Sequence, residues 1–233
     1  MISKEKKAVV FDFDGTLTKK NQNIWKMLWE VCGYPTDKTS LYAKLYVSHV
    51  INKEITRKEW FDLTCEAFKR KNLDFNNFYK VSRDIKLIEG FENTIKTLYG
   101  NGYQLHIVSG CIKEAIEIAL GKNAKYFAFI ESNQAIFDMD GKLNKLKPTE
   151  FDYEGKAKYI ENLKKTGIKA ENITFVGNSD NDEWAYTTGC KTICINPEKT
   201  DANNSKIWHT TLERLDNLKQ ILPLIVKNEE KEF

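Results

Sequence analysis

The chain of 233 residues contains no apolar run long enough to cross a lipid bilayer. Its basic start, Lys4 to Lys7, does precede an apolar stretch, but this stretch reaches Asp12 after a few residues and is too short for the core of a secretion signal. We therefore expect no membrane partner and place the protein in the cytoplasm.

Cysteine is scarce, odd in number and scattered. Cys-x-x-Cys spacing does not occur, so the sequence predicts neither a disulfide framework nor a zinc site. Unpaired thiols of this kind suit a reducing cytoplasm. The five residues are Cys32, Cys65, Cys111, Cys190 and Cys194.

An excess of charge of one sign is also missing. The 36 Lys and Arg residues and 33 Asp and Glu residues are interspersed and give a formal charge of +3. This balance offers no electrostatic case for a nucleic-acid partner, and we expect none. The remaining composition, 41% hydrophobic and 30% charged, is typical of an ordinary globular protein with one sizeable domain or a core with an appendage.

The most informative stretch of the sequence is an apolar run that ends at two carboxylates. Ala8 to Phe11 has the length and β-branched content of a strand buried on both faces. Asp12 and Asp14 follow it, and Gly15 lets the chain turn sharply. Two carboxylates held together repel unless a cation or a shared proton relieves them. The stretch indicates a charged site at a strand end, with a simple surface turn as the alternative.

A second Asp-x-Asp-Gly pattern occurs at Asp138 to Gly141. Its upstream neighbours are polar, and no threonine follows the glycine. Asp-Gly between alternating segments is a strong hairpin signal. We therefore interpret this second copy as a turn.

The order of the predicted elements indicates the fold class. Apolar spacing predicts four consecutive helical segments within residues 19–88, and Thr56 and Glu59 have capping-box spacing ahead of the third. Outside this interval strands alternate with helices, which is typical of a parallel sheet covered on both faces. We predict an α/β fold: residues 1–18 and 89–233 form a Rossmann-like parallel sheet sandwiched by helices, and residues 19–88 form an inserted α-helical bundle cap.

Three further stretches carry polar groups to the carboxyl ends of predicted strands, where active groups gather in such folds. Ser109 and Gly110 follow the strand Tyr103 to Val108 and are expected to open the next helix, either binding a phosphoryl oxygen or only capping that helix. One of Lys156 and Lys158, at the start of another helix, could point toward the strand ends.

The last of these stretches, Gly177 to Asp182, follows a buried strand and offers the hard oxygen ligands that Mg²⁺ prefers, or else a structural Asx turn. Beyond it we expect a short helix at Asn181 to Thr188 and a final helix from Leu212 to Val226, followed by a charged tail at residues 227–233.

Taken together, the four stretches resemble the four motifs of the haloacid dehalogenase-like hydrolases, in that family's order, and most closely the phosphoserine-phosphatase-like branch. The resemblance covers nearly the whole chain and implies a Mg²⁺-dependent phosphatase that hydrolyses a small phosphorylated metabolite. It implies that Asp12 attacks phosphorus to form an aspartyl-phosphate and that Asp14 acts as acid and base. The residues it implies for substrate binding are Ser109, Gly110, Lys156 and Thr16, and those for the metal are Asp12, Asp14, Asn178 and Asp182.

The sequence departs from the family pattern at two positions. Asn178 stands where the family usually has an aspartate, which weakens the metal site, makes Asp180 an alternative ligand and admits a catalytically silent phospholigand-binding protein. Asn21 stands near the place of a glutamate that holds the amino group of phosphoserine. Aromatic residues in the cap could cage a quaternary ammonium or form the bundle's own core: Trp25, Trp29, Tyr42, Tyr46 and Trp60.

Overall fold

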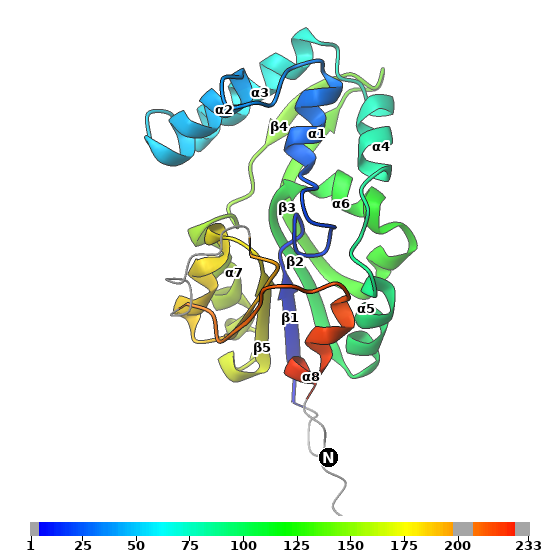
Figure 1. Ribbon diagram of the computed structural model, residues 1–233, viewed down its shortest axis with the longest axis vertical. Helices are drawn as coiled ribbons and strands as arrows, with labels where there is room; N and C mark the ends of the chain where they lie inside the picture. The colour runs from blue at the N-terminus through cyan, green and yellow to red at the C-terminus, as the bar shows by residue number, and fades with distance from the viewer. Residues whose placement is uncertain (1–4, 198–206, 227–233) are drawn as a thin grey trace, which may run out of the picture.

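The computed structural model describes residues 5–197 and 207–226, and a seven-stranded sheet of order β4-β3-β2-β1-β5-β6-β7 forms its centre (Figure 1). Only β4 runs antiparallel to its neighbour; the other adjacent strands are parallel. The predicted Rossmann-like α/β fold is confirmed. The strands are β1 (Lys7–Phe11), β2 (Tyr103–Ile112), β3 (Phe127–Phe137), β4 (Leu143–Lys147), β5 (Ile173–Gly177), β6 (Lys191–Ile195) and β7 (Thr210–Leu212).

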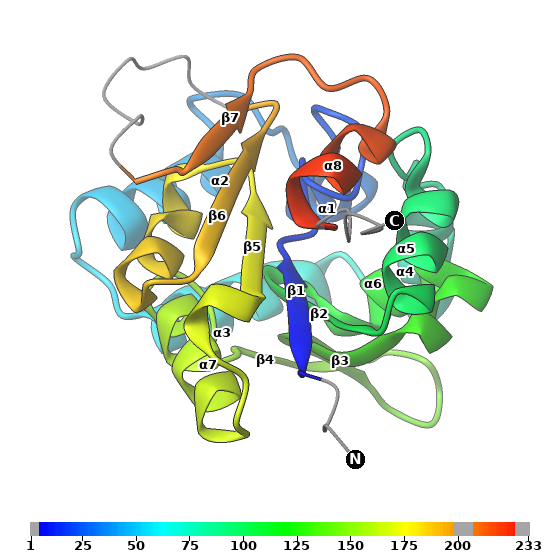
Figure 2. The same ribbon diagram turned by 90° about the horizontal axis from the view of Figure 1, so that it is seen from below.

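Helices cover both faces of the sheet (Figure 2). On one side lie α5 (Phe91–Gly100), α6 (Lys113–Leu120) and α8 (Leu222–Ile225), and on the other lie α7 (Glu154–Lys165) and the 3₁₀ helix η4 (Asp180–Thr188). Shorter 3₁₀ turns are η2 (Gly121–Tyr126), η3 (Ala170–Asn172) and η6 (Leu218–Ile221). Among the described residues no helix is long and apolar enough to span a membrane.

The central strand β1 is buried on both faces because its side chains alternate between two apolar clusters. Val9 and Phe11 pack in the cluster that contains α5 and α6, whereas Ala8 and Val10 pack in the cluster that contains α7. All four are 0% exposed. This double burial explains why no polar residue occurs between Lys7, at the half-buried start of the strand, and Asp12.

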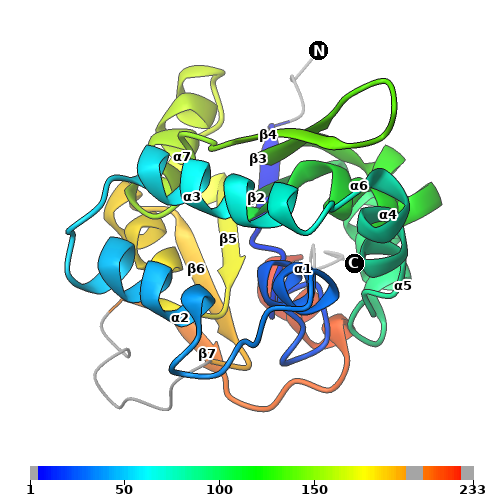
Figure 3. The same cartoon turned by 90° about the horizontal axis from the view of Figure 1, so that it is seen from above.

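The cap lies between β1 and α5, across the end of the sheet (Figures 1 and 3). It contains α1 (Ile24–Val31), α2 (Leu41–Tyr46), the π-helix η1 (Val47–Ile51), α3 (Arg57–Arg70) and α4 (Phe75–Arg83). The predicted capping box of Thr56 and Glu59 is present at the start of α3.

The two connections between cap and sheet run side by side. The backbone N–H of Ile88 donates to the carbonyl of Leu17, and that of Lys19 donates to the carbonyl of Lys86. The apolar core is nevertheless continuous, because cap residues such as Phe61 belong to the same buried cluster as Phe11. A division into a cap of residues 19–88 and a core of the remainder therefore stays a prediction.

The second Asp-x-Asp-Gly copy forms the turn of the β3–β4 hairpin, as predicted. The backbone of this hairpin also bonds to the cap: the N–H of Phe75 donates to the carbonyl of Gly141 at 2.7 Å, and the N–H of Leu143 donates to the carbonyl of Leu73 at 3.1 Å. The cap is thus bonded to this hairpin as well as at its two connections.

Two predicted elements are wrong. Ser109 and Gly110 do not open a helix, because β2 continues to Ile112 and α6 begins only at Lys113. The Ser132 hydroxyl on β3 bonds to the carbonyls of Ser109 and Cys111 and keeps this segment in the sheet.

The final helix predicted from Leu212 to Val226 is replaced by β7, η6 and the one-turn α8. The side chain of Asn196 bonds to both the N–H and the carbonyl of Leu215 and ties this segment to the end of β6. The predicted tail at residues 227–233 lies outside the described residues.

Candidate active site

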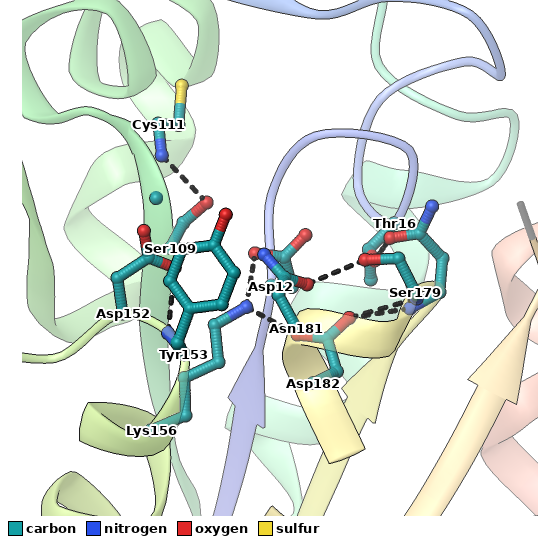
Figure 4. A network of polar contacts seen from close by, with 12 residues as sticks. Asp12, Thr16, Ser109, Cys111, Asp152, Tyr153, Lys156, Ser179, Asn181 and Asp182 are labelled. Atoms are coloured by element: carbon teal, nitrogen blue, oxygen red, sulfur yellow. Dashed lines mark hydrogen bonds and ion pairs between the residues drawn. The ribbon is translucent and has the colours of Figure 1, made fainter. Parts of the chain in front are cut away.

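The candidate site lies where β1, β2 and β5 end, beneath the cap (Figures 1 and 4). Phe11 pairs with Val176, and the N–H of Asp12 donates to the carbonyl of Val176 at 2.9 Å. This register places Asp12 beside the loop that begins at Gly177. Asp12 is only 4% exposed, so its carboxylate needs partners inside the protein.

Lys156 supplies the principal positive charge of this site. Its side chain is fully buried, and its Nζ donates to Asp12 Oδ1 at 3.1 Å and also to Asp182 Oδ1. Lys158 instead lies at the surface, where it pairs with Glu150. Of the two lysines considered from the sequence, Lys156 is the one that points toward the strand ends.

Burial and neighbouring charges act against each other on this pair. Burial raises the pKa of the Asp12 carboxyl to about 7, while Lys156 opposes the rise. Burial also works to lower the pKa of Lys156, but the carboxylates of Asp12, Asp182 and Asp152 raise it above the ordinary value. Lys156 is therefore protonated and shared between the side chains of Asp12 and Asp182.

Ser109 and Gly110 lie beside Asp12 at the end of β2. The Ser109 side chain is buried and near enough to the Asp12 carboxyl to lower its pKa, and its Oγ accepts the N–H of Cys111 at 3.2 Å. A side chain at position 110 would collide with Asp152, because a Cβ there would lie 2.6 Å from Asp152 Oδ2. The close approach of the Asp152 carboxylate to the backbone therefore explains why position 110 is a glycine.

Thr16 and Asn178 face each other. The Thr16 hydroxyl is buried and donates to Asn178 Oδ1 at 3.2 Å. Gly15, with φ 75°, lies next to the amide nitrogen of Asn178. A Cβ at position 15 would clash with that nitrogen. Thr16 thus orients Asn178, and its predicted contact with substrate stays a prediction.

Asp182 stabilises the loop after β5 through hydrogen bonds to its backbone. Its Oδ2 accepts the N–H groups of Asn178 at 2.9 Å and Ser179 at 3.1 Å, while its Oδ1 accepts Lys156. The residue is fully buried. Because both oxygens already accept hydrogen bonds, the geometry assigns Asp182 to positioning Asn178 and Lys156; its predicted role as a metal ligand stays untested.

A comparison with protein families decides the identity of this fold and site. The model of the haloacid dehalogenase-like hydrolases matches residues 9–195, which is most of the chain. The chain belongs to this family. Curated relatives support its phosphoserine-phosphatase-like branch.

The curated relatives include the phosphoserine phosphatase of Methanocaldococcus jannaschii, 28% identical over 188 residues, or 78% of this chain and 81% of that protein. The phosphoserine phosphatase of Archaeoglobus fulgidus is 25% identical over 181 residues, and the match spans 77% of this chain but about half, 49%, of that protein. The predicted family, its branch and its class, a phosphoric monoester hydrolase, are confirmed.

Solved structures show the same fold. A phospho-aspartyl intermediate analogue of phosphoserine phosphatase superimposes with a TM-score of 0.72 at 23% identity, covering 96% of this chain and 100% of the other. A substrate-bound phosphoserine phosphatase complex gives 0.69 at 23% identity, with the same coverage.

In this haloacid dehalogenase-like chain, Asp14 lies between the sheet and the cap. Its Oδ2 accepts the N–H of Ile24, the first residue of α1, at 3.5 Å. Burial, with the nearby charge of Asp14, raises the pKa of the Cys111 thiol well above the usual range. The predicted acid–base residue therefore contacts the start of the first cap helix. A movement of α1 would change the surroundings of the Asp14 carboxylate.

Several residues of the site have no signal in the sequence. Arg57, at the start of α3 in the cap, donates to Asp152 Oδ2 at 2.9 Å and to Asn133 Oδ1 at 3.3 Å. The carbonyl of Gly110 accepts Asn133 Nδ2 at 2.6 Å and Trp25 Nε1 at 2.9 Å. The contacts of Arg57 and Trp25 join the cap to the region beside Ser109, across separations of 76 to 95 residues that no local pattern indicates.

The oxygen atoms of the candidate site fit a Mg²⁺ ion in part. Within residues 5–197 and 207–226, no three side chains among Asp, Glu, His and Cys converge as ligands. Asp12 and Asn178 do offer hard oxygens at adjacent strand ends, both almost fully buried, in a site with two carboxyl groups to one ammonium. These features fit a cation that completes its shell with backbone, water or substrate oxygens.

Proposed function

We propose that this protein is a Mg²⁺-dependent phosphatase that hydrolyses a small phosphomonoester through an aspartyl-phosphate on Asp12. The observation that carries the proposal is the buried group formed by Asp12, Ser109 and Lys156, in which a carboxylate at a strand end meets a hydroxyl and an ammonium. Phosphoryl transfer asks a protein mainly for positioning and neutralisation of charge, and this group supplies both.

In the proposed reaction an Asp12 oxygen attacks phosphorus, and the bond to the leaving oxygen breaks. Lys156 and Ser109 stabilise the charge on the phosphoryl oxygens, and Asp14 gives its proton to the leaving group. Asp14 then takes a proton from water, which attacks the aspartyl-phosphate and restores Asp12. Mg²⁺, held by Asp12 and Asn178, would add positive charge beside the transferring group.

The substrate we propose is a small phosphorylated metabolite, with no nucleic-acid or membrane partner. The named relatives are phosphoserine phosphatases, yet the residue near their amino-binding position is Asn21, which is exposed before α1. Trp25 and Trp29 are buried in the core, where both rings pack and Trp25 also donates to the Gly110 carbonyl. The five cysteines are free and buried, which suits the cytoplasmic location that we also propose.

The proposal is tested by measuring turnover of an aryl phosphate with and without Mg²⁺, using Asp12→Asn as the inactive control. We expect hydrolysis that depends on the metal and on Asp12. If the wild-type protein binds inorganic phosphate but hydrolyses no phosphate ester, the alternative of a silent phospholigand-binding protein replaces the phosphatase.

Asp14→Asn should slow turnover in a way that depends on the leaving group. A phenolate leaves without a proton and an alkoxide does not, so formation of the aspartyl-phosphate should slow by about 100-fold or more for alkyl phosphates and much less for aryl phosphates. Single-turnover rates with both ester types measure this step alone. Equal losses would remove Asp14 from the acid role.

Asn178→Asp should tighten Mg²⁺ binding. The exchange adds one negative charge at contact distance from the proposed cation, and we expect the Mg²⁺ concentration for half-maximal activity to fall roughly tenfold, about 1.4 kcal/mol. The rate at saturating metal should change less. Asp180→Asn, in the same loop, is the matched control and should leave the metal dependence unchanged. If Asp180→Asn instead raises the Mg²⁺ concentration for half-maximal activity and Asn178→Asp has no effect on it, Asp180 is the ligand.

A further inference from the structure

Tyr153 has a backbone conformation that side chains rarely adopt. It directly precedes α7 and has φ 50° and ψ −124°. Positive φ is uncommon for residues with a Cβ and exceptional for bulky ones, and this combination of angles is normally left to glycine. Strain of this kind persists only where the surroundings enforce it, and it clusters at functional sites.

Asp152 enforces the conformation. Its Oδ1 accepts the N–H of Tyr153 at 3.0 Å, and its Oδ2 accepts the guanidinium of Arg57 from the cap at 2.9 Å. The carbonyl of Tyr153 in turn accepts the N–H of Lys156 at 2.9 Å. The strained turn therefore carries Lys156, and one explanation of the strain is that it serves only to place this lysine.

The direction of the Tyr153 side chain suggests a second role. Figure 4 shows its ring extending from the loop before α7 toward the end of β1, in view between Ser109 and Asp12. The ring is only partly buried, and its hydroxyl interacts electrostatically with Asp152, with Tyr46 of the cap, with Arg57 and with Lys156. The phenol thus lies close to Tyr46 of the cap and to Lys156, whose ammonium is bonded to Asp12.

The surface that the ring offers is aromatic rather than cationic, because the two cations beside it are already paired. Arg57 is bonded to Asp152, and Lys156 is bonded to Asp12 and Asp182. Burial raises the pKa of the Tyr153 hydroxyl well above its usual range, so the phenol stays neutral at physiological pH. A planar, uncharged group is the natural partner for such a surface.

We propose that Tyr153 determines specificity for the leaving group: its ring forms one wall of the leaving-group site and favours phosphomonoesters whose leaving group is planar and aromatic. This inference rests on the proposed phosphatase function. Contact between two aromatic rings should be worth roughly a twofold to tenfold preference in kcat/KM over an otherwise similar site without the ring.

The test compares Tyr153→Phe, Tyr153→Ala and Tyr153→Gly with the wild type on phenyl phosphate and ethyl phosphate. The ratio of kcat/KM for the two esters is compared between variants, so their different intrinsic reactivities cancel. We expect Tyr153→Phe to keep the wild-type ratio within about twofold, and the Ala and Gly variants to lose the same roughly twofold to tenfold preference. Tyr99→Ala, an exposed tyrosine on α5, is the control and should leave the ratio unchanged.

The Ala and Gly variants separate the ring from the backbone. Both lack the ring, but glycine adopts φ 50° without strain, so we expect a higher Tm for Tyr153→Gly than for Tyr153→Ala. If glycine restores the wild-type ratio and rate while alanine does not, the turn serves only Lys156 and the proposal is overturned. An unchanged ratio in all variants would also overturn it.

Failure of the proposed function has a different signature in the same experiment. The wild-type protein would then hydrolyse neither ester, and the inference would fall with it. The order of the two Tm values would be unaffected, because it depends on the backbone at position 153 alone.

Discussion

Asp12→Asn should lose at least about a thousandfold in turnover and remain folded. The amide keeps the volume of the carboxyl group but cannot attack phosphorus to form a stable acyl-phosphate. Burial raises the pKa of Asp12 because it disfavours the charged form, and the neutral amide avoids this cost. Lys156 keeps its second partner, Asp182. We therefore expect the free energy of unfolding to lie within about 1 kcal/mol of wild type.

Two measurements check this result. Steady-state hydrolysis of an aryl phosphate gives the loss of activity, and urea unfolding shows that the variant is folded. Acid-quenched wild-type protein, mixed briefly with substrate, should gain the mass of one phosphoryl group, whereas the variant should not. Turnover by Asp12→Asn at more than a few per cent of the wild-type rate would rule out the covalent mechanism.

Lys156→Met should be the most destabilising single change in the site. Lys156 is fully buried between Asp12 and Asp182, and methionine fills similar space without charge. Breaking a buried ion pair from one side costs about 3–5 kcal/mol, because the remaining charges stay buried without a partner. Turnover should also fall by at least about 100-fold, since a cation that stabilises the transferring phosphoryl group is lost.

The stability deficit of Lys156→Met should depend on pH in a defined direction. Lys156 lowers the pKa of Asp12, so its removal allows that pKa to rise further above the value of the unfolded chain. The native variant then binds more protons than the unfolded one, and its free energy of unfolding falls as pH rises from 5 to 8. The deficit relative to wild type should shrink at low pH.

Lys158→Met is the matched control for this prediction. It removes the same charge two residues away on the same helix, where the side chain is 57% exposed and paired with Glu150 at the surface. The expected change is within about 0.5 kcal/mol, without loss of turnover. Similar unfolding curves for the two variants, measured without Mg²⁺ at several pH values, would show that the buried pair contributes little.

The order of the motifs was sufficient to predict the fold and the place of the site. A strand buried on both faces is mostly apolar, so the abrupt change from the run Ala8 to Phe11 to the carboxylate of Asp12 marks the end of a central strand. Parallel strands present their carboxyl ends at one edge of the sheet, and this rule brings Asp12, Ser109 and Asn178 together without knowledge of the contacts.

Local patterns failed where long-range contacts override them. Ser109 has the signature of a helix N-cap, but bonds from Ser132 on the neighbouring strand keep it in β2. The apolar spacing near the end of the chain predicts a helix from Leu212, but pairing of β7 with β6 removes its first part. In both cases a partner distant in the sequence provides hydrogen bonds that the local sequence cannot indicate.

The sequence by itself determined the α/β fold, the central strand, the hairpin at Asp140 and Gly141 and the residue types gathered at the site, because these follow from short-range periodicity and turn chemistry. Only the tertiary structure decided how the polar groups are shared: Asp182 braces a loop and Lys156, Thr16 orients Asn178, and Arg57 joins the cap to Asp152. Hydrogen-bond partners inside a buried site are chosen by the packing of distant segments, and no local spacing encodes that choice.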